Sequence, residues 1–244
     1  MNYKMEKEEN YGHIQENYRE IKKIVSDTAT KVGVDPETIK IIAVTKTHPV
    51  ELINQATFAG IEYIGENRVQ EAEEKIPLLN QPSPEFHFIG HLQRNKINKL
   101  LSLNPALIHS IDSISLAKSL NNSAKRIGRI QPILFQINTS GEESKSGFAP
   151  DYSELLEAVR QISQFSNVKI KGLMTISKLT DDATEIRECF VMLREIYERL
   201  QAEKIENCDM EILSMGMSGD YQIAIEEGAN MLRIGSAIFG HREN

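Results

Sequence analysis

A single lysine, Lys46, ends a run of apolar and β-branched residues in the segment IIAVTKTHPV, positions 41 to 50. The run from Ile41 to Thr45 has no polar alternation, which is typical of a strand buried on both faces. Pro49 suits the first turn of a helix, because its fixed φ is helical and its missing N–H would have no partner there. The amine therefore lies either on the surface at a strand end or at the mouth of an α/β sheet, where such folds carry their chemistry.

Two segments rich in glycine and serine suggest an anion site. They are SMGMSGD, residues 214–220, and RIGS, residues 233–236. Turns of this kind point backbone N–H groups into the mouth of a barrel, and the hydroxyls of Ser214, Ser218 and Ser236 add donors. Because barrels frequently bind phosphate after their seventh and eighth strands, we predict a phosphorylated ligand. The alternative is that glycine and serine serve only tight loops.

A lysine amine that faces a phosphate site indicates a ligand with both a carbonyl group and a phosphate. The amine can form a Schiff base where its surroundings free the nitrogen lone pair. Two chemistries fit these residues, an aldolase that acts on a phosphosugar and pyridoxal 5′-phosphate held on Lys46 as a Schiff base. The residues alone leave both open.

Three other motifs carry weaker signals. GEESKSG is not a nucleotide P-loop, because five residues separate its glycines and no Lys-Ser/Thr pair follows, so residues 140–147 are expected to form a shaped rim loop. His87 and His91 are too far apart on an expected strand to share a metal easily, so we predict structural or ring contacts and no metal site. Asp112 either orients a neighbour or caps a helix that starts at Ser113.

Composition excludes several classes of protein. The 244 residues include 28 basic and 35 acidic side chains, a net charge of −7, which disfavours nucleic acid as the main partner. The polar N-terminus has no apolar signal region and no apolar run is long enough to span a bilayer, so we expect a cytoplasmic protein with no membrane partner. Cys189 and Cys208 form no C-x-x-C pair, and we expect both to be reduced and structural.

The elements that must position the lysine and the glycine turns follow an alternating pattern. An amphipathic helix comes first, with Ile14, Tyr18, Ile21 and Val25 on one face. Eight apolar runs alternate with helical patterns after it: IKIIAV, EYIGE, FHFIG, ALIHSID, PILFQIN, IKGLMT, EILSMG and MLRIGS. Such alternation implies parallel strands with right-handed crossovers. We predict an α/β fold, a single-domain (β/α)8 barrel over residues 13–244, with a doubly wound open sheet as the alternative.

Three details accompany this fold prediction. ELINQATFA is expected to be a helix that ends at Gly60, and Gly228 is expected to be a second C-cap. Ile186, Phe190, Leu193 and Leu200 are expected on one stripe of the helix before the seventh strand. The polar extension of residues 1–12 is expected to be disordered.

The motifs together resemble the YggS/PROSC family of pyridoxal 5′-phosphate (PLP) binding proteins, which act in PLP homeostasis and are related to the barrel domain of alanine racemase. They are AVTKTHP, GENRVQE, HFIGHLQRNK, HSID, QINTSGEESKSGF, KGLM, LSMGMSGD and RIGSAIFG, in the family's order, and they extend the resemblance from about residue 10 to Arg242. His48 and Thr45 differ from the residues frequent in the family, which affects peripheral contacts.

The resemblance implies a role for each candidate site residue. Lys46 would be the Schiff-base lysine, and Asn67 would lie near the cofactor ring. Arg233 would lie against the cofactor, near the pyridine nitrogen or the phosphate. The residues around the phosphate would be Ser214, Met217, Ser218, Gly235 and Ser236.

The resemblance also implies a function, that of a monomeric protein that holds PLP and hands it to apoenzymes, in vitamin B6 and amino-acid homeostasis, without turnover. An arginine at the pyridine nitrogen keeps that nitrogen unprotonated, so the ring is a weaker electron sink than one paired with a carboxylate. Racemisation needs two bases, and alanine racemase takes its second from a C-terminal domain, which this chain is expected to lack. The alternatives are a single-domain PLP-dependent amino-acid racemase, a weak transaminase, or a Schiff-base phosphosugar lyase.

Overall fold

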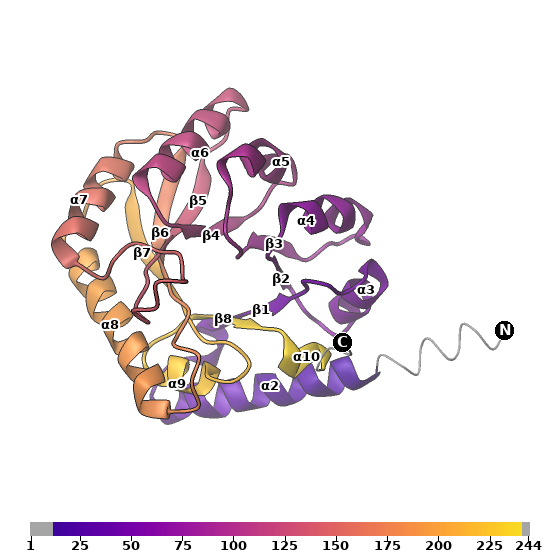
Figure 1. Ribbon diagram of the computed structural model, residues 1–244. Coiled ribbons are helices and arrows are strands. Elements are labelled where there is room, and N and C mark those ends of the chain that lie inside the picture. Colours follow the sequence, from indigo (N-terminus) through magenta and orange to yellow (C-terminus); the bar gives the residue numbers. More distant parts are fainter. Residues whose placement is uncertain (1–11, 241–244) are drawn as a thin grey trace.

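Eight parallel strands form a closed barrel in the computed structural model, which describes residues 12–240 (Figure 1). The strands pair in chain order, and β8 pairs with β1. They are β1 (Lys40–Val44), β2 (Tyr63–Glu66), β3 (Glu85–Phe88), β4 (Leu107–Ile111), β5 (Gln131–Gln136), β6 (Val168–Met174), β7 (Cys208–Ser214) and β8 (Met231–Ile234). Each of the eight apolar runs overlaps one of these strands. The predicted (β/α)8 barrel is confirmed, and the open sheet is wrong.

Helices surround the barrel (Figure 1). They are α2 (Gly12–Lys31), α3 (Val50–Phe58), α4 (Val69–Lys75), α5 (Ile97–Ser102), α6 (Ile114–Arg126), α7 (Tyr152–Ser163), α8 (Ala183–Ala202), α9 (Tyr221–Glu226) and α10 (Ser236–Phe239), with 3-10 turns η1 (Pro36–Thr38), η2 (Ile76–Leu78) and η3 (Arg94–Lys96). None of the helices within residues 12–240 combines the length and apolar character needed to cross a membrane.

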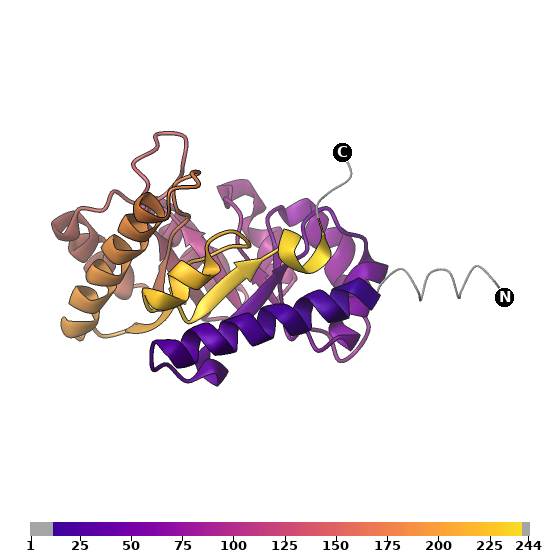
Figure 2. The same cartoon turned by 90° about the horizontal axis from the view of Figure 1, so that it is seen from below.

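The first helix, α2, covers the side of the barrel where the chain ends. Figure 2 shows it running along β8 and α10, and the Asn17 side-chain amide donates to the Ile238 carbonyl at 3.0 Å. The four residues predicted on its apolar face are all buried, which confirms the amphipathic helix. The predicted extension, residues 1–12, lies outside the described residues except for Gly12, which begins α2.

Apolar side chains fill two layers. The larger lies between the strands and the helices, and it includes the predicted α8 stripe, Ile186, Phe190, Leu193 and Leu200. The smaller lies inside the barrel and consists of Ile42, Leu107, Leu134, Met174 and Met231. Buried polar side chains occupy the rest of the barrel interior, among them His87, His109 and Arg233. The interior is therefore less apolar than barrel interiors usually are.

Helix boundaries agree with the predictions except at two positions. Gly60 and Gly228 follow α3 and α9 with φ values of 92° and 91°, as expected for C-caps. Pro49 does not lie in the first turn of α3, because it is the N-cap, with an extended ψ of 162°. The reason is the turn after β1, where Thr47 takes a left-handed φ of 68° and delays the helix to Val50.

Ser113, and not Asp112, caps α6. The Leu116 N–H donates to Ser113 Oγ at 3.2 Å. Asp112 instead accepts a hydrogen bond from Ser113 Oγ at 3.2 Å and pairs with His91 at 3.3 Å. The capping interpretation of Asp112 is wrong, because the residue directly before a helix supplies the cap, and the alternative that it orients a neighbour is confirmed.

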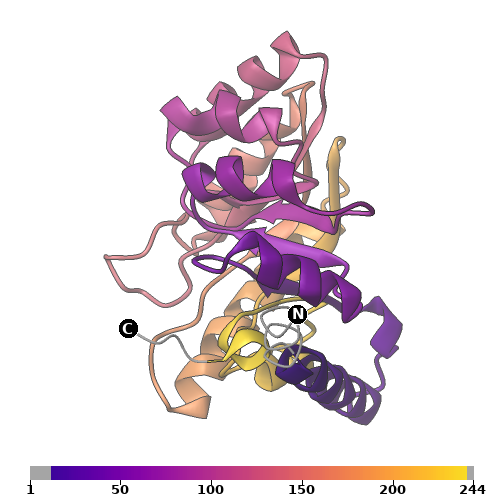
Figure 3. The same cartoon turned by 90° about the vertical axis from the view of Figure 1, so that its right-hand side faces the viewer.

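The loop between β5 and α7 projects from the barrel (Figure 3). Asn138 Nδ2 donates to the carbonyls of Glu142, at 3.0 Å, and Lys145, at 3.3 Å. The Lys145 ammonium also donates to the Ser177 carbonyl at 2.7 Å. Residues 140–147 therefore form the shaped rim loop that the sequence predicts.

Gly172→Ala is expected to destabilise the barrel strongly. Gly172 in β6 has a φ of 145°, and a Cβ there would lie 1.9 Å from the Ile212 carbonyl oxygen. Overpacking and backbone strain together predict a loss of about 3 kcal/mol in unfolding free energy, measured by urea denaturation. Gly128→Ala is the control, because Gly128 also has a positive φ of 65° but no atom within 4 Å of the added Cβ. Equal losses in the two variants would contradict the steric argument.

Candidate functional site

The carboxyl ends of β1, β7 and β8 surround a cavity of about 270 Å³. Its lining residues are Val44, Lys46, His48, Met217, Ser218, Gly219, Arg233, Gly235, Ser236 and Gly240. The cavity therefore unites six of the eight predicted site residues, and only Asn67 and Ser214 do not line it. It lies at the end of the barrel where the loops after the strands converge, which is the end that carries function in this fold.

The backbone on both sides of Lys46 is held by hydrogen bonds. The N–H of Thr45 donates to the Gly65 carbonyl at 3.0 Å, and its buried hydroxyl donates to Glu66 Oε1 at 2.6 Å. The N–H of Thr47 donates to Glu71 Oε2 at 2.8 Å. A left-handed φ is unfavourable for a β-branched residue such as threonine, and this bond to a carboxylate stabilises it. The direction in which Lys46 leaves the strand is therefore set by β2 and α4.

A buried ion cluster beneath Lys46 supplies these hydrogen-bond partners. The Lys75 ammonium lies 3.0 Å from Glu66 Oε1, 3.0 Å from Glu71 Oε2 and 3.0 Å from the Thr45 carbonyl oxygen. Burial raises the pKa of Glu66, although hydrogen bonds from Thr45 and Lys75 oppose the increase. Burial also acts to raise the pKa of Glu71, but the Thr47 N–H and Lys75 outweigh it and lower that pKa.

The Arg233 guanidinium is buried in the barrel interior and borders the cavity. Nη1 donates to Ser214 Oγ at 2.7 Å, and Nη2 donates to the Thr175 carbonyl at 2.7 Å. Burial lowers the pKa of Arg233 to about 10, while the Asp220 carboxylate acts in the opposite direction, so the group stays charged at neutral pH. Ser214 is fully buried and holds Arg233 from behind instead of lining the cavity as predicted.

The turns after β7 and β8 direct N–H groups to one point. Ser218 Oγ accepts hydrogen bonds from the N–H of Gly235 and the N–H of Ala237, each at 3.2 Å. Asp220 is buried and accepts the Met217 N–H, which fixes the turn that carries Ser218. Asp220 was not predicted as a site residue, although Asp220 lies in the motif SMGMSGD. His48 was expected to make only peripheral contacts. His48 lines the cavity, and its ring lies tilted by 37° against the Phe239 ring, with the two ring centroids 4.6 Å apart.

Asn67 lies beyond the cavity, at the end of β2. Its Oδ1 is buried and has no hydrogen-bond partner within the described part of the chain. A Cβ on Gly90 would lie 2.0 Å from the Asn67 carbonyl oxygen, so the segments after β2 and β3 approach closely. The structure thus places Asn67 beside the mouth of the barrel without bringing it to the other site residues.

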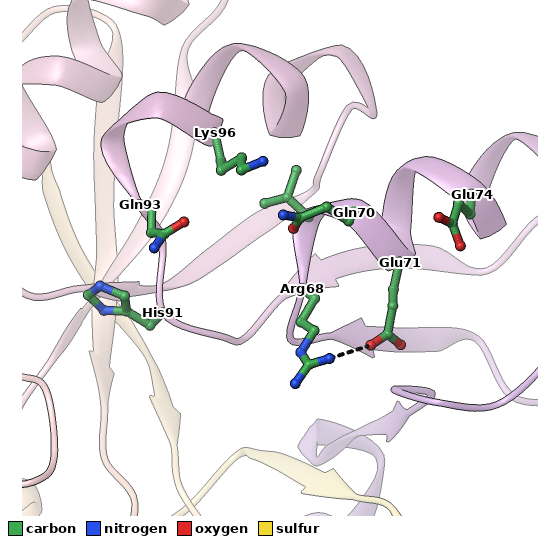
Figure 4. Close-up of a pocket in the computed structure, with 8 residues that line it drawn as sticks. Arg68, Gln70, Glu71, Glu74, His91, Gln93 and Lys96 are labelled. Carbon is green, nitrogen blue, oxygen red and sulfur yellow. Dashed lines mark ion pairs between the residues drawn. The ribbon is translucent and has the colours of Figure 1, made fainter.

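A second hollow of about 510 Å³ lies between the segments that follow β2 and β3. Figure 4 shows that Arg68, His91 and Lys96 line it, together with Glu71, which pairs with Arg68 at 3.9 Å. None of the eight predicted site residues lines it.

His87 lies apart from His91, because it is buried inside the barrel against the Tyr63 ring, with ring centroids 5.9 Å apart, which agrees with the predicted ring contact.

The two cysteines have no part in the cavity. Cys189 is buried in α8, and Cys208 begins β7. Both are free thiols, as predicted, and burial raises the pKa of Cys208 to about 12. A thiol with so high a pKa is a poor nucleophile at neutral pH.

Comparisons with known proteins agree on one family. The family model "Alanine racemase, N-terminal domain" matches residues 10–243. The pyridoxal phosphate homeostasis protein of Helicobacter pylori is 42% identical over 202 residues, which are 82% of this chain and 87% of that protein. PipY of Synechococcus elongatus, in a structure with PLP bound, is 35% identical with a TM-score of 0.76, over 89% of this chain and 100% of PipY. An alanine racemase of Clostridium difficile shares the fold with a TM-score of 0.70 at 17% identity, over 91% of this chain and 56% of the racemase.

Glu66→Gln tests the electrostatic cost of the ion cluster. The pKa of Glu66 is higher in the folded than in the unfolded protein. Between these two pKa values the folded protein therefore binds a proton on Glu66 that the unfolded protein does not bind. The unfolding free energy of the wild type falls as the pH rises through this range. The variant lacks this titration, so we expect its unfolding free energy relative to wild type to increase between about pH 4 and pH 8. Urea denaturation measures it, with Glu62→Gln at an exposed position as the control. A relative stability that falls with pH would contradict the assignment.

Proposed function

Because this chain belongs to the pyridoxal phosphate homeostasis protein family, which has the fold of the alanine racemase N-terminal domain, we propose that it binds PLP in the 270 Å³ cavity, with a Schiff base at Lys46. The observation that carries the proposal is the meeting of a lysine amine, an arginine and converging N–H donors around one cavity. A PipY structure holds PLP, and that protein is covered over its whole length by this chain.

The residues of the two turns fit a phosphate group. The N–H groups of Gly235 and Ala237 both donate to a single oxygen, Ser218 Oγ. A phosphate oxygen likewise binds where several N–H donors converge. A Cβ on Gly219 would meet no atom within 4 Å, so the backbone of this turn is open to a ligand. Ser236 is exposed at the same turn and adds a hydroxyl donor. We assign the phosphate to Met217, Ser218, Gly235 and Ser236.

Arg233 fits a role against the aromatic ring of the cofactor. A guanidinium has only donors, so it would bind the pyridine nitrogen in its unprotonated form. PLP supplies an electron sink when it is bound, and this sink is weaker when the pyridine nitrogen carries no proton. The hydrogen bonds to Ser214 and Thr175 keep the guanidinium in place without any carboxylate at the ring.

The same geometry favours a protein that holds PLP over one that turns over amino acids. Lys46 and His48 are the titratable residues besides Arg233 that line the described cavity, and both lie on the segment between β1 and α3. Racemisation needs bases on the two opposite faces of one carbon, and no second chain segment supplies such a base among the described residues that line this cavity. We therefore propose that the chain takes up PLP and hands it on in vitamin B6 and amino-acid homeostasis. Transfer to apoenzymes, the monomeric state and the cytoplasmic location remain predictions.

A turnover assay separates this proposal from an amino-acid racemase. Purified protein is incubated with PLP and L-alanine or L-serine, and the D-isomer is measured. Turnover that disappears in Lys46→Ala would show that the protein is an enzyme, and the carrier proposal would be wrong. Borohydride trapping with candidate phosphosugars, followed by mass spectrometry at Lys46, tests the lyase alternative.

Lys46→Ala is expected to abolish the absorption band of the PLP Schiff base. The wild type, Lys46→Ala and Lys118→Ala are each titrated with PLP and compared by visible absorption. Lys118 is an exposed lysine on α6, so its variant controls for nonspecific reaction of surface amines. An undiminished band in Lys46→Ala would move the Schiff base to another lysine, and no band in the wild type would refute PLP binding at this amine.

Ser218→Ala is expected to weaken PLP but not pyridoxal, which has no phosphate. Loss of one hydrogen bond to a charged group costs about 1.5 to 3 kcal/mol, which is roughly a 10- to 100-fold increase in Kd. Fluorescence titration with both ligands measures it, and Ser115→Ala, at an exposed position on α6, is the control. An equal loss for the two ligands would contradict a phosphate role for this hydroxyl.

A further inference from the structure

A chain of polar side chains crosses the barrel interior and ends at Arg233. It begins at Glu85, the first residue of β3, whose half-exposed carboxylate lies at the end of the barrel opposite the cavity. His87 Nε2 lies 3.0 Å from Glu85 Oε1, and His87 Nδ1 lies 2.9 Å from His109 Nε2. His109 Nδ1 lies 3.1 Å from Ser214 Oγ, which accepts from Arg233. Both histidines and the serine are at most 2% exposed, so water does not compete for these bonds.

The donors and acceptors fix one direction for the hydrogens. The Glu85 carboxylate can only accept, so His87 Nε2–H donates to it and, in the neutral ring, His87 Nδ1 accepts from His109 Nε2–H. His109 Nδ1 then carries no hydrogen and accepts from the Ser214 hydroxyl, which itself accepts from Arg233. Every polar atom in the chain is satisfied while both imidazoles are neutral. Burial lowers the pKa of His109 well below its ordinary value, and His87 and Arg233 act in the same direction.

We propose that Glu85, His87 and His109 are positioning residues for Arg233, which fix through Ser214 the orientation of the guanidinium and the direction of hydrogen bonding beside the bound cofactor. The proposal rests on the proposed PLP function only for its effect on the ligand. The direction of hydrogen bonding along the polar side chains is a property of the protein alone. The carboxylate at one end of the barrel thus determines whether the Ser214 hydroxyl beside Arg233 directs its hydrogen toward His109 or away from it.

The other charged groups around the outer histidine support the same direction. The Lys40 ammonium from β1 lies over the Tyr63 ring of β2 at 4.9 Å, and that ring meets His87 edge to face. The hydrogen bond from His87 lowers the pKa of Glu85, burial opposes this, and Lys40 adds to the lowering. Glu85 is therefore held as a carboxylate, which can only accept.

The direct test is Glu85→Lys, which is expected to reverse the direction of hydrogen bonding along these polar side chains. A lysine at this position can only donate, so His87 Nε2 must accept, His87 Nδ1–H donates to His109, and His109 Nδ1–H donates to Ser214. Nitrogen NMR of the histidine rings in ligand-free protein at neutral pH is expected to show hydrogen on His109 Nε2 in the wild type and on Nδ1 in the variant. PLP binding is expected to weaken about two- to thirtyfold in the variant, since coupling through such networks has this size.

Two matched variants complete the experiment. Glu85→Gln keeps an acceptor oxygen for His87 and is expected to retain the wild-type tautomer. Glu62→Lys makes the same charge change at an exposed position just before β2, without a side-chain bond to either histidine, and is expected to match wild type in NMR and PLP titration. Should Glu85→Lys fail to fold, His87→Phe is the substitute, because it leaves His109 Nε2 without an acceptor and is expected to move the hydrogen to Nδ1.

The outcomes separate the two proposals. Hydrogen on His109 Nδ1 in the wild type, or an unchanged tautomer in Glu85→Lys, would overturn the positioning chain. A changed tautomer with unchanged PLP affinity would overturn its link to the ligand. Failure of the wild type to bind PLP would refute the proposed function alone, because the NMR measurement needs no ligand.

Discussion

Pairing of β1 with β8 is the interaction on which the site depends, because it closes the sheet and brings its first and last strands together. The register places Ile42 opposite Arg233 and Ala43 opposite Ile234. The segment that follows β1 therefore meets the turn after β8, and a Cβ on Gly235 would lie 3.4 Å from Val44. In an open sheet these two strands would lie at separate positions, and the lysine would not face the glycine turn.

Closure leads to a second constraint. Charged groups buried near the mouth of the barrel need hydrogen-bond or ion-pair partners inside the protein. Two groups of polar residues supply them on neighbouring sides of the cavity. Lys75 in α4 pairs with Glu66 in β2 at 3.0 Å, and Ser214 and Thr175 bind the Arg233 guanidinium, whose charged form the Asp220 carboxylate favours. Buried charges stabilise a fold poorly, because desolvation offsets much of the attraction between them. Their presence is better explained by position, since one group holds the backbone around Lys46 and the other holds the guanidinium.

Sequence patterns predict the strands and the identity of the mouth residues, because both are local. Each strand overlaps a largely apolar run, and residues at strand ends of a barrel must converge, so Lys46, Ser218 and Gly235 could be united from the sequence. Contacts between strands could not be predicted in this way. Nothing in the spacing of His87 shows that its partner is His109, 22 residues away on β4, and the same limit hid the link from Lys75 to Thr45. Ser214 was assigned to the phosphate because it ends β7, but the twist of the barrel turns it toward Arg233.

Both anchors of the cavity are held from outside it, and this bears on function. The backbone at Lys46 and the guanidinium of Arg233 are hydrogen-bonded to side chains that do not line the cavity. A carrier needs a preformed site for one ligand and no machinery that reacts with it further. A racemase needs in addition a second base on the far face of the substrate, and among the described residues the titratable groups that line the cavity come only from the segment after β1 and from β8. This lining supports the proposal that the chain holds a carbonyl phosphate and does not transform an amino acid.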